Sequence, residues 1–188
     1  MNGMEIPTGA STERPFGSLD PVWPLTPPKP RGRYLPGMLE EMILPALVQR
    51  LDRIPDATLL IRTISEQMAD ATGLAAATLE QAFTERLRRG GVATPEGVAF
   101  PHAVIAGVRR TVIGCMLIPG GIELDARQPP SDLVFAIAGD SARPWEHVRL
   151  LARLSRIAGD EASRHRLRAC GDGHALIAAL RQEDARHG

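Results

Sequence analysis

The sequence has very few cysteines, and their arrangement excludes two classes of protein. Cys115 and Cys170 are the only two among 188 residues, and neither belongs to a Cys-x-x-Cys or mixed Cys/His pattern. Structural zinc sites and disulfide scaffolds need more numerous or more closely spaced cysteines. We therefore predict no metal site, and we expect Cys115, which lies inside an apolar run, to be a small core residue.

The sequence also lacks an excess of charge of either sign. Its 22 Lys and Arg residues balance 22 Asp and Glu residues. Binding to nucleic acid or to an anionic membrane surface draws on surplus positive charge. We therefore expect no nucleic-acid partner.

Long apolar runs are missing as well. No segment approaches the roughly 20 apolar residues that span a bilayer, and residues 1–15 contain Glu5 and Glu13 without the apolar stretch of a signal peptide. With 44% hydrophobic and 23% charged residues, the composition is typical of a globular domain with a sizeable core. The expectation is a cytoplasmic protein without membrane insertion.

Proline is unevenly distributed and divides the chain near residue 37. Eight of the 16 prolines precede that position, and each removes a backbone donor and restricts the residue before it. We predict a proline-rich, flexible extension over residues 1–37 and a folded domain over residues 38–188. An alternative for the extension is an arm that docks Trp23 and Tyr34 on this domain or on a partner.

Hydrophobic periodicity in residues 38–188 predicts helices and short buried strands. The expected helices are 38–51 (with Pro45 at a helix start or break), 55–73, 78–89 (opened by a capping box from Thr78 to Gln81), 144–158 and 173–182, and the expected strands are 97–100, 111–118 and 132–138. The last two strands are apolar almost throughout, which is typical of strands covered on both faces. The pattern predicts an α/β or α+β fold.

Motifs that carry chemistry are few, since GxGxxG, P-loop, HExxH and GxSxG are all absent. The most unusual string is Gly-Val-Ala-Phe-Pro-His at 97–102, in which a buried strand ends in proline and His102 follows at the strand exit. A rigid, partly exposed imidazole is suited to nucleophilic chemistry near neutral pH. The alternative is that His102 only caps a strand in a surface loop.

Two further residues are candidates for a site. His147 precedes a run of leucines that places it on the buried face at the start of a helix. It is either a core histidine or an imidazole that points into a pocket beside a strand end, shielded by Trp145. Arg86 ends a predicted helix with Arg88 and Arg89, where cations are favoured by the helix dipole; the functional alternative for Arg86 is a bidentate clamp on a phosphoryl group.

Arg86, Gly90 and the string 97–102 together resemble the signature of the mannitol/fructose-type EIIA domain of the bacterial sugar phosphotransferase system, a family that includes the nitrogen-regulatory EIIA proteins. Arg86 stands sixteen residues before His102, as in that signature. The likeness extends to the segments 121–125, 132–135, 147–154 and 174–180. In all it covers roughly residues 39–183.

The resemblance implies a central mixed β-sheet of about five strands flanked by helices, and a phosphocarrier that works without cofactor. His102 would accept the phosphoryl group, His147 would stabilise it and Arg86 would clamp it. The donor would be an HPr-type phosphocarrier protein. The phosphoryl group would pass to an EIIB or permease partner or serve as a regulatory signal, and an isolated domain favours the nitrogen-type branch.

One segment departs from the family pattern. Where the family has a Ser-Thr-Gly loop, this chain has Gly-Val-Ala-Thr-Pro at 91–95, and the residue after Arg86 is Leu87 instead of Glu. Pro95 removes a backbone donor, and Thr94 offers a hydroxyl only at a shifted position. These changes leave an alternative open: an EIIA-like regulatory module that binds a protein partner and no longer transfers phosphate.

Overall fold

The computed structural model describes residues 38–187. The predicted extension over residues 1–37 lies outside the described residues. The elements, in chain order, are α1 (Met38–Met42), β1 (Ile43–Arg50), α2 (Ala57–Thr72), α3 (Ala76–Arg88), β2 (Val98–Ala99), β3 (His102–Ile105), β4 (Val112–Ile122), β5 (Ser131–Asp140), α4 (Pro144–Gly159), α5 (Glu161–Arg168) and α6 (Gly173–Arg186).

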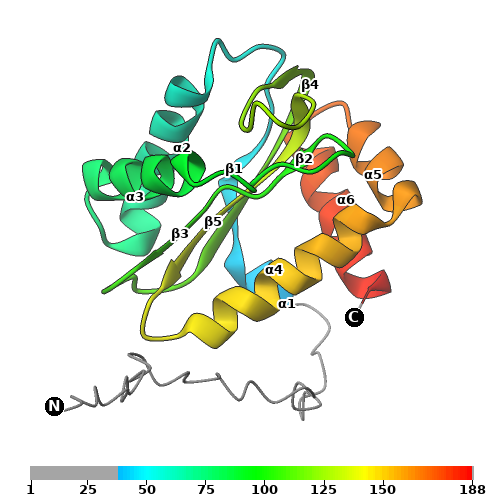
Figure 1. The fold of residues 1–188 in the computed structure, drawn as a ribbon. Helices are drawn as coiled ribbons and strands as arrows, with labels where there is room; N and C mark the ends of the chain where they lie inside the picture. The colour runs from blue at the N-terminus through cyan, green and yellow to red at the C-terminus, as the bar shows by residue number, and fades with distance from the viewer. Residues whose placement is uncertain (1–37, 188) are drawn as a thin grey trace, which may run out of the picture. The chain divides into compact units, whose positions relative to one another are not determined.

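The strands form one mixed five-stranded sheet in the order β1-β4-β5-β2, with β3 also paired to β5. β4 and β5 are antiparallel, whereas β1 runs parallel to β4, and β2 and β3 run parallel to β5. Figure 1 shows α2 and α3 on one face of the sheet and α4, α5 and α6 on the other. The predicted fold class, a mixed sheet of about five strands flanked by helices, is confirmed.

Alternate residues of the two central strands feed two separate hydrophobic layers. Ile113 and Phe135 belong to the layer beneath α4, α5 and α6, while Val112 and Val134 belong to the layer beneath α2 and α3. Successive side chains of a strand point to opposite faces, so a sheet covered twice needs apolar residues at nearly every position. The unbroken apolar runs in the sequence have this origin.

The predicted helix over residues 38–51 is wrong for residues 43–50, which form a strand. The helix stops at Met42, and the chain continues as β1. Pro45 has no amide hydrogen, so it cannot continue a helix, and it is tolerated where β1 bulges at the edge of the sheet between Ile43 and Val48. The apolar spacing looked helical because the bulge shifts the register of the inward-facing residues.

Two helix starts and two missed elements are smaller corrections. α2 begins after Asp56, whose carboxylate caps Leu59 N–H at 2.8 Å, so Pro55 precedes the helix. α3 begins at Ala76 without a side-chain cap, and the predicted capping box at Thr78 is wrong. β3 and α5 were not expected; α5 is mostly charged and polar, and β3 depends on pairing with distant β5.

A buried arginine joins the helices of one layer. Arg153 of α4 is 1% exposed, and its Nε donates to Asp184 Oδ1 of α6 at 2.6 Å. Arg153 also donates to the main-chain carbonyls of Asp184 and His187, and Asp184 accepts from Leu39 N–H of α1. A buried ion pair is stable only when its other hydrogen bonds are made, and here they are supplied by the end of α6.

No helix within residues 38–187 has the length and apolar character needed to cross a membrane.

Candidate functional site

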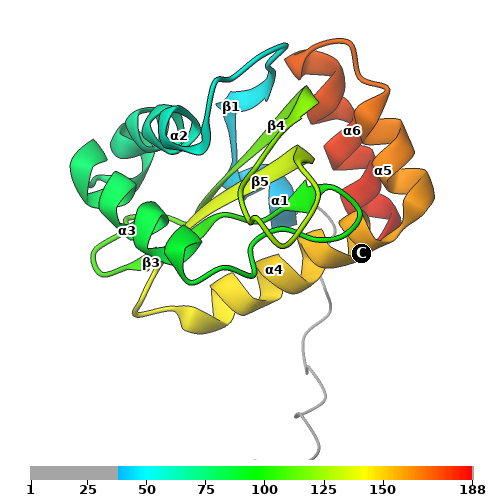
Figure 2. The ribbon, with the colours of Figure 1, turned by 45° about the horizontal axis from the view of Figure 1, so that its top comes forward.

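The candidate site lies where α3 ends, β3 begins and α4 begins. Figure 2 shows these three elements grouped at one edge of the sheet. β2 and β3 lie along the same side of β5 in one register, with Val98 opposite Leu133 and His102 opposite Ile137. Pro101 interrupts the ladder between them, but its carbonyl still accepts from Ile137 N–H at 3.0 Å. The sheet edge therefore continues through the proline and fixes the backbone of His102.

His102 is the first residue of β3, which corrects the prediction of a histidine at a strand exit. Its Nδ1 lies 2.8 Å from the carbonyl oxygen of Phe100. A carbonyl can only accept, so Nδ1 carries the hydrogen and Nε2 keeps its lone pair. The Phe100 ring stacks on Phe135 of β5, with centroids 5.6 Å apart, so the orientation of this carbonyl is set by core packing.

Arg86 contacts the free nitrogen of that imidazole. Its Nε donates to His102 Nε2 at 2.8 Å, and its Nη1 donates to the Gly90 carbonyl at 2.7 Å. A guanidinium always acts as donor, so this contact confirms that Nε2 is an acceptor. The structure thus places Arg86, predicted at a helix end, directly on the predicted histidine.

His147 lies beside His102, with ring centroids 5.0 Å apart. It is 6% exposed, in the first turn of α4, and neither of its ring nitrogens has a hydrogen-bond partner among the described residues. Leaving a buried polar group unpaired costs about 1–3 kcal/mol. Such a group is typical of a site that completes its hydrogen bonds with a ligand.

The electrostatics keep both imidazoles neutral. Burial lowers the pKa of His102, and the charge of Arg86 lowers it further, against the opposing effect of the Phe100 hydrogen bond. Burial lowers the pKa of His147 to about 4, with smaller contributions from His102 and Arg86. A neutral imidazole retains the lone pair that a nucleophile needs, so the acceptor form dominates near neutral pH.

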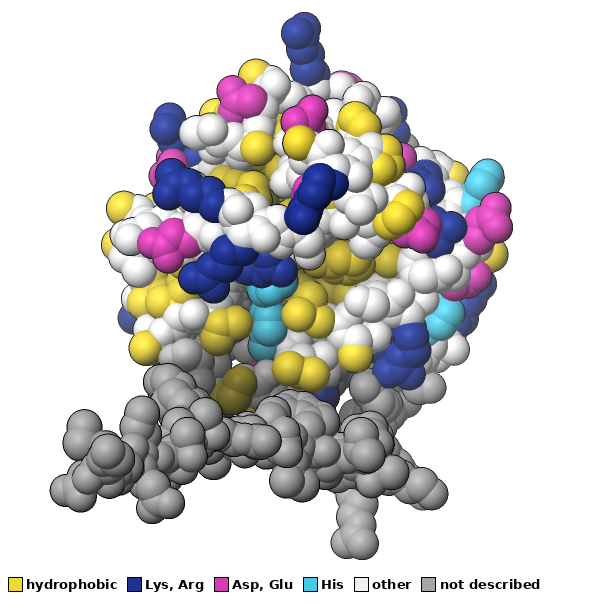
Figure 3. Space-filling view, viewed as in Figure 1, with side chains coloured by type: hydrophobic (Ala, Val, Ile, Leu, Met, Phe, Trp, Pro, Cys, Tyr) yellow, Lys and Arg dark blue, Asp and Glu magenta, His cyan; other side chains and the backbone are white. Residues whose placement is uncertain are grey.

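An open pocket lies beside His102. Its lining includes Arg86, Arg89, His102 and Val104, with Glu85 on the same helix. On the face seen in Figure 3, arginine side chains gather against a histidine, and hydrophobic side chains lie near it. The pocket is therefore cationic and opens to solvent.

Large apolar side chains are exposed on the two elements that carry the histidines. Val104 of β3 is 43% exposed, and Trp145 and Val148 of α4 are 54% and 64% exposed. Arg149 lies over the Trp145 ring, 5.2 Å from its centroid. Trp145, expected to shield a pocket at His147, is itself about half exposed and is not among the residues that line the pocket at His102.

The loop after α3 is held by a carboxylate from another loop. Asp125 Oδ2 accepts from Gly91 N–H at 2.7 Å, and the neighbouring Gly90 carbonyl is the group that Arg86 binds. Arg127 donates twice to Asp125, and these bonds, together with that from Gly91, hold the pKa of Asp125 well below its usual range. Asp125 thus positions Arg86 through Gly90 and Gly91, a role that sequence reasoning missed although the segment 121–125 was noted.

In the altered segment 91–95, the Thr94 hydroxyl is buried and has no hydrogen-bond partner among the described residues. Thr94 is not among the residues that line the pocket, and its main chain pairs with Val98 and Gly97 instead. Glu96, which would oppose a phosphate if it pointed inward, is exposed. The positive charge that lines the pocket comes from Arg86 and Arg89, at the end of α3 and directly after it.

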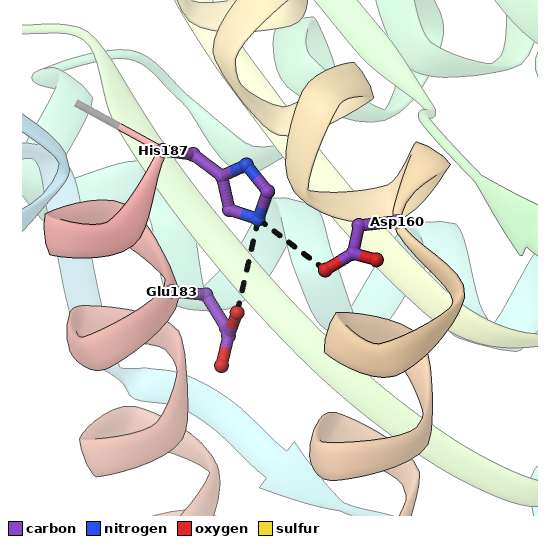
Figure 4. Close-up of side chains that lie close together, drawn as sticks. All are labelled: Asp160, Glu183 and His187. Carbon is purple, nitrogen blue, oxygen red and sulfur yellow. Dashed lines mark ion pairs between the residues drawn. The ribbon is translucent and has the colours of Figure 1, made fainter.

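One group of side chains in the described part of the chain has metal-ligand chemistry. Asp160, Glu183 and His187 bring three ligand atoms within 4.8 Å of one another, and Figure 4 shows the imidazole of His187 turned toward both carboxylates. Arg166 already donates to both oxygens of Glu183, at 2.6 and 2.9 Å, and buried Ser163 donates to it at 2.6 Å. We assign the group to an ion-paired network that joins α5 to α6.

The chain matches the model of a known family. The model of the family "Phosphoenolpyruvate-dependent sugar phosphotransferase system, EIIA 2" matches residues 41–183. The chain therefore belongs to this family, and the resemblance seen in its sequence is confirmed.

Individual relatives agree with this assignment. The chain is 25% identical to a nitrogen regulatory protein of Bradyrhizobium diazoefficiens over 141 residues, which are 74% of this chain and 89% of that protein. The fold is similar to that of the nitrogen regulatory protein IIA-Ntr from Neisseria meningitidis, with a TM-score of 0.68, 20% identity and coverage of 74% and 97% of the two chains. It is also similar to a solved complex of mannitol enzyme IIA with phosphorylated enzyme IIB from Escherichia coli, with a TM-score of 0.56, 22% identity and coverage of 74% and 94%.

Proposed function

We propose that this protein is a phosphocarrier that accepts a phosphoryl group on Nε2 of His102 and passes it to a second protein. The observation that carries the proposal is the pair of contacts on one imidazole: Phe100 O at Nδ1 and Arg86 Nε at Nε2. The first contact fixes the tautomer, and the second aims a cation at the nitrogen where phosphate would be bound. Membership of the EIIA 2 family supports this reading.

The transfer step follows from this arrangement. The Nε2 lone pair of His102 attacks phosphorus while the bond from phosphorus to the donor's nitrogen breaks, and that electron pair stays on the donor. The His102 ring becomes cationic, and its Nδ1–H remains bonded to the Phe100 carbonyl. Phosphoryl transfer asks a protein mainly for in-line positioning and charge stabilisation, which a fixed imidazole and an arginine provide.

Arg86 must change partner during this step. Its Nε–H occupies the Nε2 lone pair in the free protein, so it has to move to a phosphoryl oxygen as the new bond forms. Its Nη1 bond to Gly90 can persist, which limits the movement to a small rotation. Arg86 then acts as the phosphate clamp.

His147 is suited to stabilise the bound phosphate. Its ring lies beside His102 and has no hydrogen-bond partner among residues 38–187. Because its pKa is lowered to about 4, it is neutral and can donate one N–H to a phosphoryl oxygen. A neutral donor stabilises the product without repelling Arg86.

The donor is proposed to be an HPr-type phosphocarrier protein, and the acceptor an EIIB or permease partner or a regulatory target. The exposed apolar side chains of Val104, Trp145 and Val148 flank the histidine pair and provide contact area for such a partner. The 25% identity to a nitrogen regulatory protein favours the nitrogen-type branch. The solved complex of a structural relative with phosphorylated enzyme IIB supports an EIIB-type acceptor.

A second candidate function is an EIIA-like regulatory module that binds a partner without transferring phosphate. The altered segment 91–95 favours it, because Pro95 has no amide hydrogen and Thr94 is not a lining residue of the pocket. The two functions differ in one measurable product, phosphohistidine.

Incubation with phosphoenolpyruvate, the first enzyme of the phosphotransferase system and an HPr-type carrier tests the choice. The proposed function expects one acid-labile phosphate per chain, lost in His102→Ala. No labelling of the wild-type chain under conditions that label a known EIIA protein favours the regulatory module. Labelling that survives in His102→Ala overturns the assignment of the acceptor.

A further inference from the structure

Arg89, at the C-terminal end of α3, lies in the same pocket as His102. It follows the last residue of the helix, is exposed, and lines the pocket with Arg86 and His102. Its guanidinium makes no hydrogen bond or ion pair with any residue that the structure describes. From its position at a helix end, the sequence suggested only a favourable interaction with the helix dipole. The structure shows in addition that Arg89 lines the same pocket as His102.

Two cations face the same space in the free protein. The pKa of Arg86 is lowered first by burial and then by the charge of Arg89, which means that the two guanidinium groups repel each other. A phosphoryl group on histidine carries close to two negative charges at neutral pH, by analogy with other phosphorylated side chains. Such an anion would relieve the repulsion and would need more than one cation to neutralise it.

Arg86 supplies only one positive charge to this anion, and part of its donor set is already engaged. Its Nε–H is bonded to His102 and one N–H of its Nη1 to the Gly90 carbonyl, so two of its five donors are committed before transfer. The loop after α3 adds little, because Thr94 does not line the pocket and Pro95 has no amide hydrogen. Glu85, also on the pocket wall, adds negative charge that must be offset.

We propose that Arg89 is a second phosphate-binding residue of this site, which contacts the phosphoryl group on His102 and takes over the role of the missing hydroxyl loop. The inference rests on the proposed function of His102. Arg88 provides the matched comparison, since it stands next to Arg89 and is also exposed. It lines two neighbouring surface depressions and not the pocket of His102.

The first test measures the rate of labelling by a phosphorylated HPr-type carrier in Arg89→Leu, Arg89→Lys and Arg88→Leu. We expect Arg89→Leu to slow transfer about tenfold or more, Arg89→Lys to restore part of the rate, and Arg88→Leu to match the wild type. Equal rates in the two leucine variants overturn the inference while leaving the proposed function intact. If the wild-type chain is not labelled at all, the proposed function fails and the second test decides the role of Arg89.

The second test uses inorganic phosphate and does not depend on turnover. Phosphate is titrated into the unphosphorylated protein while the ring signals of His102 and His147 are followed by NMR. We expect phosphate to shift both rings and to bind about fivefold or more weakly to Arg89→Leu than to Arg88→Leu. Equal affinities, or no response of the wild-type rings, overturn the inference. Because both arginines are exposed, unchanged denaturation midpoints check that the variants remain folded.

Discussion

The Nε–H of Arg86 donates to Nε2 of His102 over 2.8 Å, so the proposed nucleophile and the proposed clamp are bonded before any phosphate arrives. This contact orders the arginine. Burial lowers the pKa of the His102 imidazole, and the Arg86 charge lowers it further, since a nearby cation disfavours a second positive charge. The contact also has to be exchanged during transfer. The site is therefore organised in advance around the position that the phosphoryl group would take.

Replacing Arg86 tests that relationship directly. In Arg86→Gln, we expect the pKa of His102 to rise, because the neighbouring positive charge is removed. Transfer to His102 should slow about a hundredfold, as is typical when a charged stabiliser of a transition state is lost. NMR titration of the His102 ring and the labelling rate are the measurements. An unchanged pKa together with an unchanged rate contradicts both roles of Arg86.

His147 gives the stability of the protein a specific pH dependence. Its pKa is about 4 in the folded chain against an ordinary value of 6.5, so the unfolded state binds more protons between these values. Stability should therefore fall as the pH drops from 6.5 toward 4 and level off below 4. From neutral pH to about pH 5, this residue should cost about 1–2 kcal/mol.

The matched variant for this effect is His147→Gln, which keeps a polar side chain but does not titrate. Urea denaturation of both proteins at two pH values gives four unfolding free energies. We expect the loss on acidification to be about 1–2 kcal/mol smaller in the variant. If the two proteins lose the same amount, His147 is not held neutral by the fold.

Asp125 should matter for transfer although it does not line the pocket of His102. Asp125→Ala removes the acceptor for Gly91 N–H and should loosen the Gly90 carbonyl that holds Arg86, slowing transfer about fivefold to tenfold. Arg127→Ala is the control, because it leaves the bond between Asp125 and Gly91 in place. We expect a near wild-type rate for the control, and equal slowing in both variants would assign the effect to the Asp125–Arg127 pair instead.

Gly114, at the centre of the sheet, has no room for a side chain. A Cβ at this position would clash with the buried Leu47 side chain, so Gly114→Ala should destabilise the protein by about 1–3 kcal/mol. Gly159, the last residue of α4, has open space around its Cβ position. Gly159→Ala should be neutral or stabilising by up to about 1 kcal/mol, and thermal or urea denaturation of the pair measures both effects.

The sequence allowed the centre of the fold to be predicted because burial leaves a simple pattern there. β4 and β5 are apolar at nearly every position, and α4 carries its leucines on one face. The strands that were missed depend on distant partners: β1 pairs with β4, and β3 pairs with β5. Pairing over such separations does not show in local spacing, and the bulge at β1 gave a helical appearance.

The candidate site also has a part that the sequence predicted and a part that it did not. The likeness to the EIIA signature brought His102, His147 and Arg86 forward, and the structure places the three together. The Phe100 carbonyl, the Asp125–Gly91 bond and the placement of Arg89 were not predicted. A carbonyl has no sequence signature, and contacts between two loops arise only once the sheet has brought the loops together.

β2 and β3 pair with β5 in one register on either side of Pro101. The reactivity of His102 therefore depends on the completion of folding. Phe100 and His102 reach their positions only when β2 and β3 have docked on β5, about 35 residues further along the chain, a long-range step of the kind that forms slowly. Before docking, the imidazole lacks its fixed tautomer and its arginine. On the proposed function, a nascent or damaged chain with a frayed sheet edge would accept no phosphate, so a partner that responds to the phosphorylated form would respond to intact molecules alone.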